Sequence, residues 1–188
     1  MPVFRVEIVG VRPLLMHRFG ESAEESLRSN VRRIQLAKKL PREEAEEAAY
    51  RLPDGRLYLP STMLQRAFVE AASDFKQRGE RQSMKYAAGA AFDPVEPILL
   101  FDPSLADYEV DSRPVVVPAT KGRVMRHRPR LEEWRIVTDV EIDTDLLEPE
   151  VAKDILEAAG RLKGLGDYRP QHGGPFGRFQ VHGFHRAG

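Results

Sequence analysis

A run of cationic side chains near the middle of the chain is the feature whose residue types point most directly to chemistry. Residues 113–130 contain no aspartate or glutamate. Their cationic or ionisable side chains are Arg113, Lys121, Arg123, Arg126, His127, Arg128 and Arg130. Along an extended hairpin, or in a loop that turns at Gly122, groups at this spacing can follow the phosphates of a polynucleotide. We therefore expect residues 118–130 to form a basic arm that binds single-stranded nucleic acid; the alternative is a solvated loop that pairs with an acidic surface of a neighbouring copy.

The glycine-rich stretch GLGDYRPQHGGPFGRFQV, residues 164–181, is the second candidate for ligand binding. Glycine permits sharp turns and the close approach of a ligand to the backbone, and a basic loop of this kind can hold an anion against its N–H groups. The candidate contacts are Tyr168, Arg169, His172, Gly173, Gly174, Phe176 and Arg178. The alternative interpretation is a tight connection between a helix and the last strand, in which the glycines serve only the turn.

Aromatic rings would strengthen binding to a single strand, because each base stacked on a ring contributes about 1–3 kcal/mol. Tyr168 and Phe176 are the candidate rings of the glycine-rich stretch. Trp134 is a further ring, but it lies in a segment of alternating hydrophobic and polar residues, and this pattern favours a position in the core.

Histidines raise the question of catalysis on RNA. A histidine can act as general base on a 2′-hydroxyl, and His17 and His127 are the candidates for that role. Histidine also binds phosphates and stacks on bases without catalysis, so both roles stay open, and we expect binding rather than an enzyme. The five histidines show no metal-binding spacing, and the chain contains no nucleotide-binding fingerprint. We expect neither a metal ion nor another cofactor.

The composition limits the class of protein. A chain of 188 residues with 41% hydrophobic residues predicts one domain with a substantial core. The chain contains no long apolar run, no signal-peptide pattern at its start and no cysteine, so we expect a cytoplasmic protein without a membrane partner. Its 29 basic and 29 acidic residues cancel, which argues against a nucleic-acid-binding protein that acts through bulk charge.

The charges are nevertheless segregated along the chain. From Asp139 to Glu157, acidic residues greatly outnumber the one basic residue, Lys153. Opposite surfaces of this kind can meet in an assembly, so we expect a homo-oligomer or filament in which an acidic helix face contacts the basic face of the next copy.

The elements that must position these residues follow from hydrophobic periodicity. Strands are predicted over residues 3–9, 95–101, 108–118, 132–143 and 178–184, and helices over residues 61–79 and 148–164. A charged helical insertion, residues 20–56, follows the first strand and is broken at Pro41. The order of elements predicts an α+β fold with a ferredoxin-like or RRM-like βαββαβ core and a basic hairpin arm.

Three separated stretches together resemble a known family. The helix start YLPSTMLQRAFVEAA, the glycine-rich stretch and the basic arm between the two central strands are similar to the repeat-associated (RAMP) RNA-binding superfamily of CRISPR systems. The resemblance implies a single RAMP-like domain over residues 1–188. Backbone subunits of CRISPR effector complexes carry a hairpin thumb at the place of the arm and polymerise along a guide RNA. The insertion has no counterpart in that family, and residues 111–134 look more like small proteins carried by prophages.

These observations lead to one expected function and two alternatives. We expect a non-catalytic protein that binds single-stranded RNA, rather than DNA, and oligomerises along the strand. The first alternative is a metal-independent endoribonuclease with a histidine base. The second is a phage single-stranded-DNA-binding or structural protein.

Overall fold

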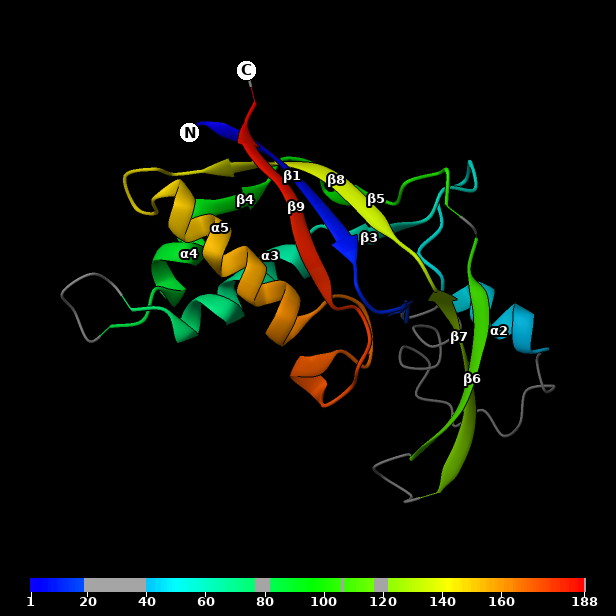
Figure 1. Ribbon diagram of the computed structural model, residues 1–188. Helices are drawn as coiled ribbons and strands as arrows, with labels where there is room; N and C mark the ends of the chain where they lie inside the picture. Colours follow the sequence, from blue (N-terminus) through cyan, green and yellow to red (C-terminus); the bar gives the residue numbers. More distant parts are fainter. Residues whose placement is uncertain (19–39, 77–81, 106, 117–121, 188) are drawn as a thin grey trace, which may run out of the picture.

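A four-stranded antiparallel sheet forms the centre of the molecule, as the computed structural model shows (Figure 1). Its strands, in the order in which they pair across the sheet, are β4 (Phe92–Pro94), β8 (Arg135–Ile142), β1 (Val3–Gly10) and β9 (Phe179–Arg186). The helices α3 (Thr62–Ala71), α4 (Lys85–Ala91) and α5 (Pro149–Ala158) lie against one face of this sheet (Figure 1). The structure describes residues 1–18, 40–76, 82–105, 107–116 and 122–187.

The core forms where the alternating strand residues meet the apolar stripes of the helices. Every second residue of β1, namely Phe4, Val6 and Ile8, is buried, because successive side chains of a strand point to opposite faces. From α3, Phe68 stacks on Phe92 of β4 with 3.8 Å between the ring centroids. The helix α5 begins at a proline, continues as a π-turn (η2, Ala159–Lys163) and ends at Gly164, which has a φ of 70°.

The other face of the central sheet carries ion pairs between neighbouring strands. Arg5 of β1 forms an ion pair with Asp139 of β8 at 2.8 Å, and Arg135 pairs with Glu7 at 2.9 Å. The strand registers place no phenylalanine, tyrosine or tryptophan on this face among the described residues. An RNA base would therefore find no such ring to stack on here, which leaves the loops and the arm as places for a ligand.

Two smaller sheets flank the central one. The strands β2 (Leu14–Leu15), β7 (Arg123–Leu131) and β6 (Glu109–Val116) pair in that order, and β3 (Tyr58–Pro60) pairs with β5 (Ile98–Leu100). The described part of the expected basic arm lies almost entirely on β7, and from here on we call the whole β6–β7 hairpin the arm. It extends away from the central sheet beside α2 (Pro41–Ala48) (Figure 1). Two short 3₁₀ helices, η1 (Ala72–Asp74) and η3 (Pro170–His172), complete the elements.

The structure confirms an α+β fold with antiparallel sheets and corrects part of the predicted order. Residues 95–101 and 108–118 were expected to supply central strands, but they contain β5 and β6, which belong to the smaller sheets. The central sheet instead uses β4, whose three residues are too few for hydrophobic alternation to reveal. Pro41 begins α2, because a proline is tolerated in the first turn of a helix, while residues 19–39 of the expected insertion lie outside the described residues. Among the described residues, no helix is long and apolar enough to cross a membrane.

Candidate nucleic-acid interface

The pairing of β6 with β7 divides the arm into two faces. Residues that pair directly across an antiparallel ladder lie on the same face, and successive residues alternate. Arg113 pairs with Arg126 and Asp111 with Arg128, so the three arginines share what we call the arginine face. The opposite face, which we call the apolar face, carries Pro114, Val116, Arg123 and Met125. Lys121, also expected to bind nucleic acid, lies outside the described residues.

The arginine face meets the glycine-rich stretch. Nη1 of Arg128 lies 2.5 Å from Oδ2 of Asp167, and the Arg128 side chain is only 11% exposed. The guanidinium group of Arg113 lies 4.7 Å from the centre of the Phe176 ring, an arrangement that favours a cation–π interaction. The structure therefore brings together two segments that the sequence presents as separate candidates.

The backbone of the glycine-rich stretch explains most of its glycines without a ligand. A Cβ at Gly174 would lie 1.8 Å from the carbonyl oxygen of Tyr168, and one at Gly177, where φ is +68°, would lie 1.8 Å from that of Leu165. These glycines are needed for a tight connection, as the alternative interpretation held. At the exposed Gly173 a Cβ would meet no atom within 4 Å, but a φ of +74° places this residue in the left-handed region that favours glycine.

The aromatic candidates differ in exposure. Tyr168 is 43% exposed, whereas Phe176 is 5% exposed and Trp134 is 1% exposed. The ring of Trp134 packs edge-on against Phe179, and its Nε1 donates a hydrogen bond to the carbonyl oxygen of Arg12. Of the three rings, Tyr168 alone offers an open face on which a base could stack.

The remaining candidates of the loop have different surroundings. Arg169 is half-buried and donates hydrogen bonds to the carbonyl oxygen of Gly166 and to Gln171. Burial, and then the nearby charge of Arg66, lower the pKa of Arg169. His172 is exposed on η3, and Nε of Arg178 is buried without a hydrogen-bond partner among the described residues.

Carboxylates of the arm itself and of neighbouring segments compensate the charge of the arm. Glu44 of α2 lies 3.7 Å from Arg126, Asp111 bonds Nε of Arg113 at 2.8 Å, and Glu132 pairs with Arg130. Arg123 has no ion-pair partner among the described residues. Residues 113–130 contain no carboxylate, but carboxylates from outside this segment lie against it in the folded protein. The surface of the arm is therefore less positive than the sequence predicts.

The two candidate histidines are held by different groups. Nδ1 of His17 lies 3.4 Å from Oδ2 of Asp167, the carboxylate that also binds Arg128. The hydrogen bond with His17, followed by the charge of Arg128, lowers the pKa of Asp167 to about 2 despite its partial burial. His127 lies on the arm, where its Nδ1 is 2.7 Å from Oγ of Ser112.

Sequence reasoning missed Asp167 and Glu44. Asp167 lies inside the glycine-rich stretch, where the expected contacts were basic, aromatic and glycine residues only. Its backbone N–H bonds to the carbonyl oxygen of Leu15 at 2.8 Å, which places its side chain between His17 and Arg128. The residues around Asp167 in the sequence do not predict that its side chain lies between His17 and Arg128. Glu44 belongs to a charged helix whose partner strand cannot be identified from periodicity.

A scan against models of known protein families finds none that matches this chain, and a search of curated proteins finds no similar sequence. Nor do the described residues contain a group of three or more histidine, aspartate or glutamate side chains that could hold a metal ion.

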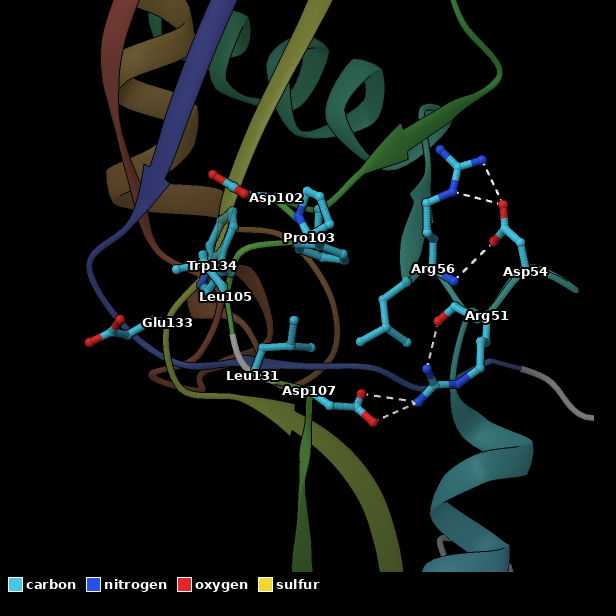
Figure 2. Close-up of a pocket in the computed structure, with 13 residues that line it drawn as sticks. Arg51, Asp54, Arg56, Asp102, Pro103, Leu105, Asp107, Leu131, Glu133 and Trp134 are labelled. Atoms are coloured by element: carbon cyan, nitrogen blue, oxygen red, sulfur yellow. Dashed lines mark hydrogen bonds and ion pairs between the residues drawn. The ribbon is translucent and has the colours of Figure 1, made fainter.

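A separate cleft of about 340 Å³ opens at the base of the arm (Figure 2). Its apolar lining comes mainly from Leu57, Phe101, Leu105, Leu131 and Trp134. Charged residues surround that lining, and they include no member of the expected nucleic-acid site. The cleft is therefore a second candidate surface, distinct from the arginine face and the glycine-rich stretch.

Proposed function

We propose that this protein binds single-stranded nucleic acid, with RNA as the ligand, and associates with further copies along the strand. The main support for this proposal is that the arm contacts the glycine-rich stretch. Arg113 covers Phe176 with its guanidinium group, and the exposed Tyr168 ring lies 6.1 Å from the Phe176 ring. A strand that follows the arginine face would meet guanidinium groups for its phosphates and an open ring for a base.

A ferredoxin-like core is part of the proposal. If only the strands of the central sheet are counted, the chain order is β1, α3, β4, β8, α5, β9, with α4 between α3 and β4. Across the sheet β4 pairs with β8, β8 with β1, and β1 with β9. Numbered in chain order, this is the strand order 2-3-1-4. This order supports a ferredoxin-like interpretation in which β5, β6 and β7 form an insertion between the second and third strands.

The likeness to the repeat-associated superfamily rests on the same topology. The arm is inserted between β4 and β8, and the glycine-rich stretch follows α5, η2 and leads into β9. These positions support a protein similar to backbone subunits of CRISPR effector complexes, and in this proposal it acts in the cytoplasm. They are equally compatible with a small phage-borne relative, whose ligand would be single-stranded DNA.

The arginines of the arm divide into two roles in this proposal. Arg126 is half-exposed, and its ion pair with Glu44 at 3.7 Å is of the surface kind that contributes little. Arg126 can therefore turn to phosphates, and Arg113 on the same face keeps 42% of its side chain exposed beside Phe176. Arg128 is mostly buried against Asp167, so it positions the arm and is not expected to touch the ligand directly.

The test is binding of a short, end-labelled single-stranded RNA, measured by fluorescence anisotropy at several salt concentrations. The double variant Arg113→Ala/Arg126→Ala removes two phosphate contacts from the arginine face, so the salt slope should fall by about 1.4. The matched control Arg5→Ala/Arg135→Ala removes the same charge from the open face of the central sheet. We expect the control to bind like the wild type; an arm variant that also binds like the wild type would contradict the proposal.

The same assay separates RNA from DNA. Tighter binding of RNA than of the equivalent DNA strand is expected. Freshly purified protein should also lose a high-mass, nucleic-acid-rich form on treatment with RNase but not with DNase. Loss with DNase alone would indicate the phage type of single-stranded-DNA-binding protein, and protein free of nucleic acid that does not bind added RNA would indicate a structural protein.

One observation favours a second function, the metal-independent endoribonuclease. His17 is half-exposed, and Asp167 lies close enough to orient its ring. In this reaction the histidine takes the proton of a 2′-hydroxyl, the 2′-oxygen bonds to phosphorus, and the bond to the 5′-oxygen breaks as that oxygen takes up a proton. The products are a 2′,3′-cyclic phosphate and a 5′-hydroxyl.

Product analysis of labelled RNA tests the second function. If it holds, His17→Ala should abolish cleavage and retain binding, while His127→Ala should cleave normally. RNA that stays intact after prolonged incubation with the wild type would exclude cleavage and leave the binding function as proposed.

A further inference from the structure

One wall of the cleft at the base of the arm carries two carboxylates that have only one ion-pair partner among the described residues. Figure 2 shows Asp102 and Glu133 beside Trp134 on one side of the cleft, with Arg51, Asp54 and Arg56 on the other. Both arginines already form ion pairs, since Arg51 lies 3.0 Å from Asp107 and Arg56 lies 2.7 Å from Asp54.

The carboxylates beside Trp134 are less well paired. The closest ion-pair partner of Asp102 is Arg135 at 3.9 Å, and Glu133 has none within the described parts of the chain. Between the two walls lie the apolar side chains Leu57, Leu105 and Leu131. The cleft therefore suits an occupant that combines an apolar surface with a positive charge.

The apolar face of the arm has this combination. Met125 is 52% exposed, and Val116 and Pro114 are also exposed on the same face. Arg123 pairs with Val116 across the hairpin, so its side chain, which has no ion-pair partner among the described residues, lies on the same face as these apolar side chains. Exposed apolar side chains that gather on one face and are bordered by charge commonly mark a surface for a protein partner.

We infer that the apolar face of one copy docks into the cleft of a second copy, with Arg123 directed at Asp102 and Glu133. The arm cannot reach the cleft of its own chain, because Leu131 lines the cleft and lies six residues after Met125 along β7, or roughly 20 Å of extended strand. The contact joins two different surfaces. Such a contact leaves one arm and one cleft free in every dimer, so further copies can add until the rotation between copies closes a ring, or without limit where it does not.

This inference deepens the proposed function, since it names the contact through which copies would follow one another along a strand. It differs from the expected contact with an acidic helix, because the acidic residues of α5 take no part. It also predicts association without any nucleic acid. The proposed RNA binding and the proposed contact can therefore fail independently.

The test is sedimentation velocity of nuclease-treated protein over a range of protein concentrations. The arm variant Val116→Asp/Met125→Asp and the cleft variant Leu105→Arg/Glu133→Lys should each be monomeric under conditions in which the wild type associates. Because each variant retains one intact surface, their equimolar mixture should form dimers but no longer species. The control Glu150→Lys/Asp154→Lys changes two acidic positions on α5 and should associate like the wild type.

A second measurement covers the case in which a charged variant fails to fold. The chain has no cysteine, so single cysteines can be introduced without competing thiols. A mixture of Met125→Cys and Leu105→Cys chains should form a mixed disulfide dimer on mild oxidation. A mixture of Met125→Cys with Val137→Cys, which is exposed on the central sheet, should not. A wild type that stays monomeric, or equal cross-linking in both mixtures, would overturn the inference.

Discussion

Arg128 of the arm and Asp167 of the glycine-rich stretch lie 39 residues apart in the sequence and form an ion pair with 2.5 Å between Nη1 and Oδ2. The pair holds the base of the arm against the loop that carries Tyr168, whose own N–H donates to the same carboxylate. His17 approaches that carboxylate from the segment after β2. The orientation of the arm therefore depends on one carboxylate that three parts of the chain share.

Breaking this pair should cost stability. Arg128→Met leaves a partly buried carboxylate with fewer partners, so we expect urea unfolding to show a loss of about 2–3 kcal/mol. The double variant Arg128→Met/Asp167→Leu should lose less stability than the sum of the losses in the two single variants, and the difference, the coupling energy, should be about 1 kcal/mol. Strictly additive losses would mean that the two side chains do not interact in solution.

The same carboxylate should produce a defined dependence on pH. Because the pKa of Asp167 is lowered to about 2 in the folded protein, its contribution is fully present above about pH 4 and is lost as the pH falls toward 2. The free energy of unfolding of Asp167→Asn should therefore lie about 1–2 kcal/mol below that of the wild type at pH 5, a range that allows for the partial exposure of the group. The difference should disappear near pH 2, whereas a constant difference would point to lost packing.

Two glycines in helical segments should respond in opposite ways to alanine. At Gly160 in η2 a Cβ would lie 2.2 Å from the carbonyl oxygen of Phe179, so Gly160→Ala should destabilise the fold by about 2–3 kcal/mol. At Gly89 in α4 the nearest atom would be Cγ2 of Val69 at 3.8 Å. Gly89→Ala should therefore stabilise the fold by about 0.5–1 kcal/mol, and thermal unfolding of both variants tests the contrast.

The exposed ring of Tyr168 should contribute to RNA affinity by stacking. Tyr168→Ala should weaken binding by about 1–3 kcal/mol in the anisotropy assay, and Tyr168→Phe should bind nearly as well as the wild type. The control is Tyr86→Ala, because Tyr86 is even more exposed but lies on α4, away from the arm. Equal effects of Tyr168→Ala and Tyr86→Ala would remove Tyr168 from the interface.

Elements with a clear period were predictable from the sequence. The alternation around Ile136 and Val140 indicates β8, and the helical spacing of Leu64 and Phe68 indicates α3, because the period of an element depends only on its own residues. The same reasoning correctly placed Trp134 in the core. It failed for β4, which is short, and for the sheet to which β5 and β6 belong, because strand pairing depends on residues far away in the chain.

The residue pattern was enough to predict an α+β chain with a strand-rich basic segment and a glycine-rich loop after its last long helix. Which side chains these segments present to a ligand became clear only from the packed fold. It set Glu44 against Arg126 and Asp167 against Arg128, buried Phe176 and left Tyr168 open. The physical reason is that secondary structure follows from neighbouring residues, whereas charge compensation and exposure depend on distances in space, which are set when separate elements pack together.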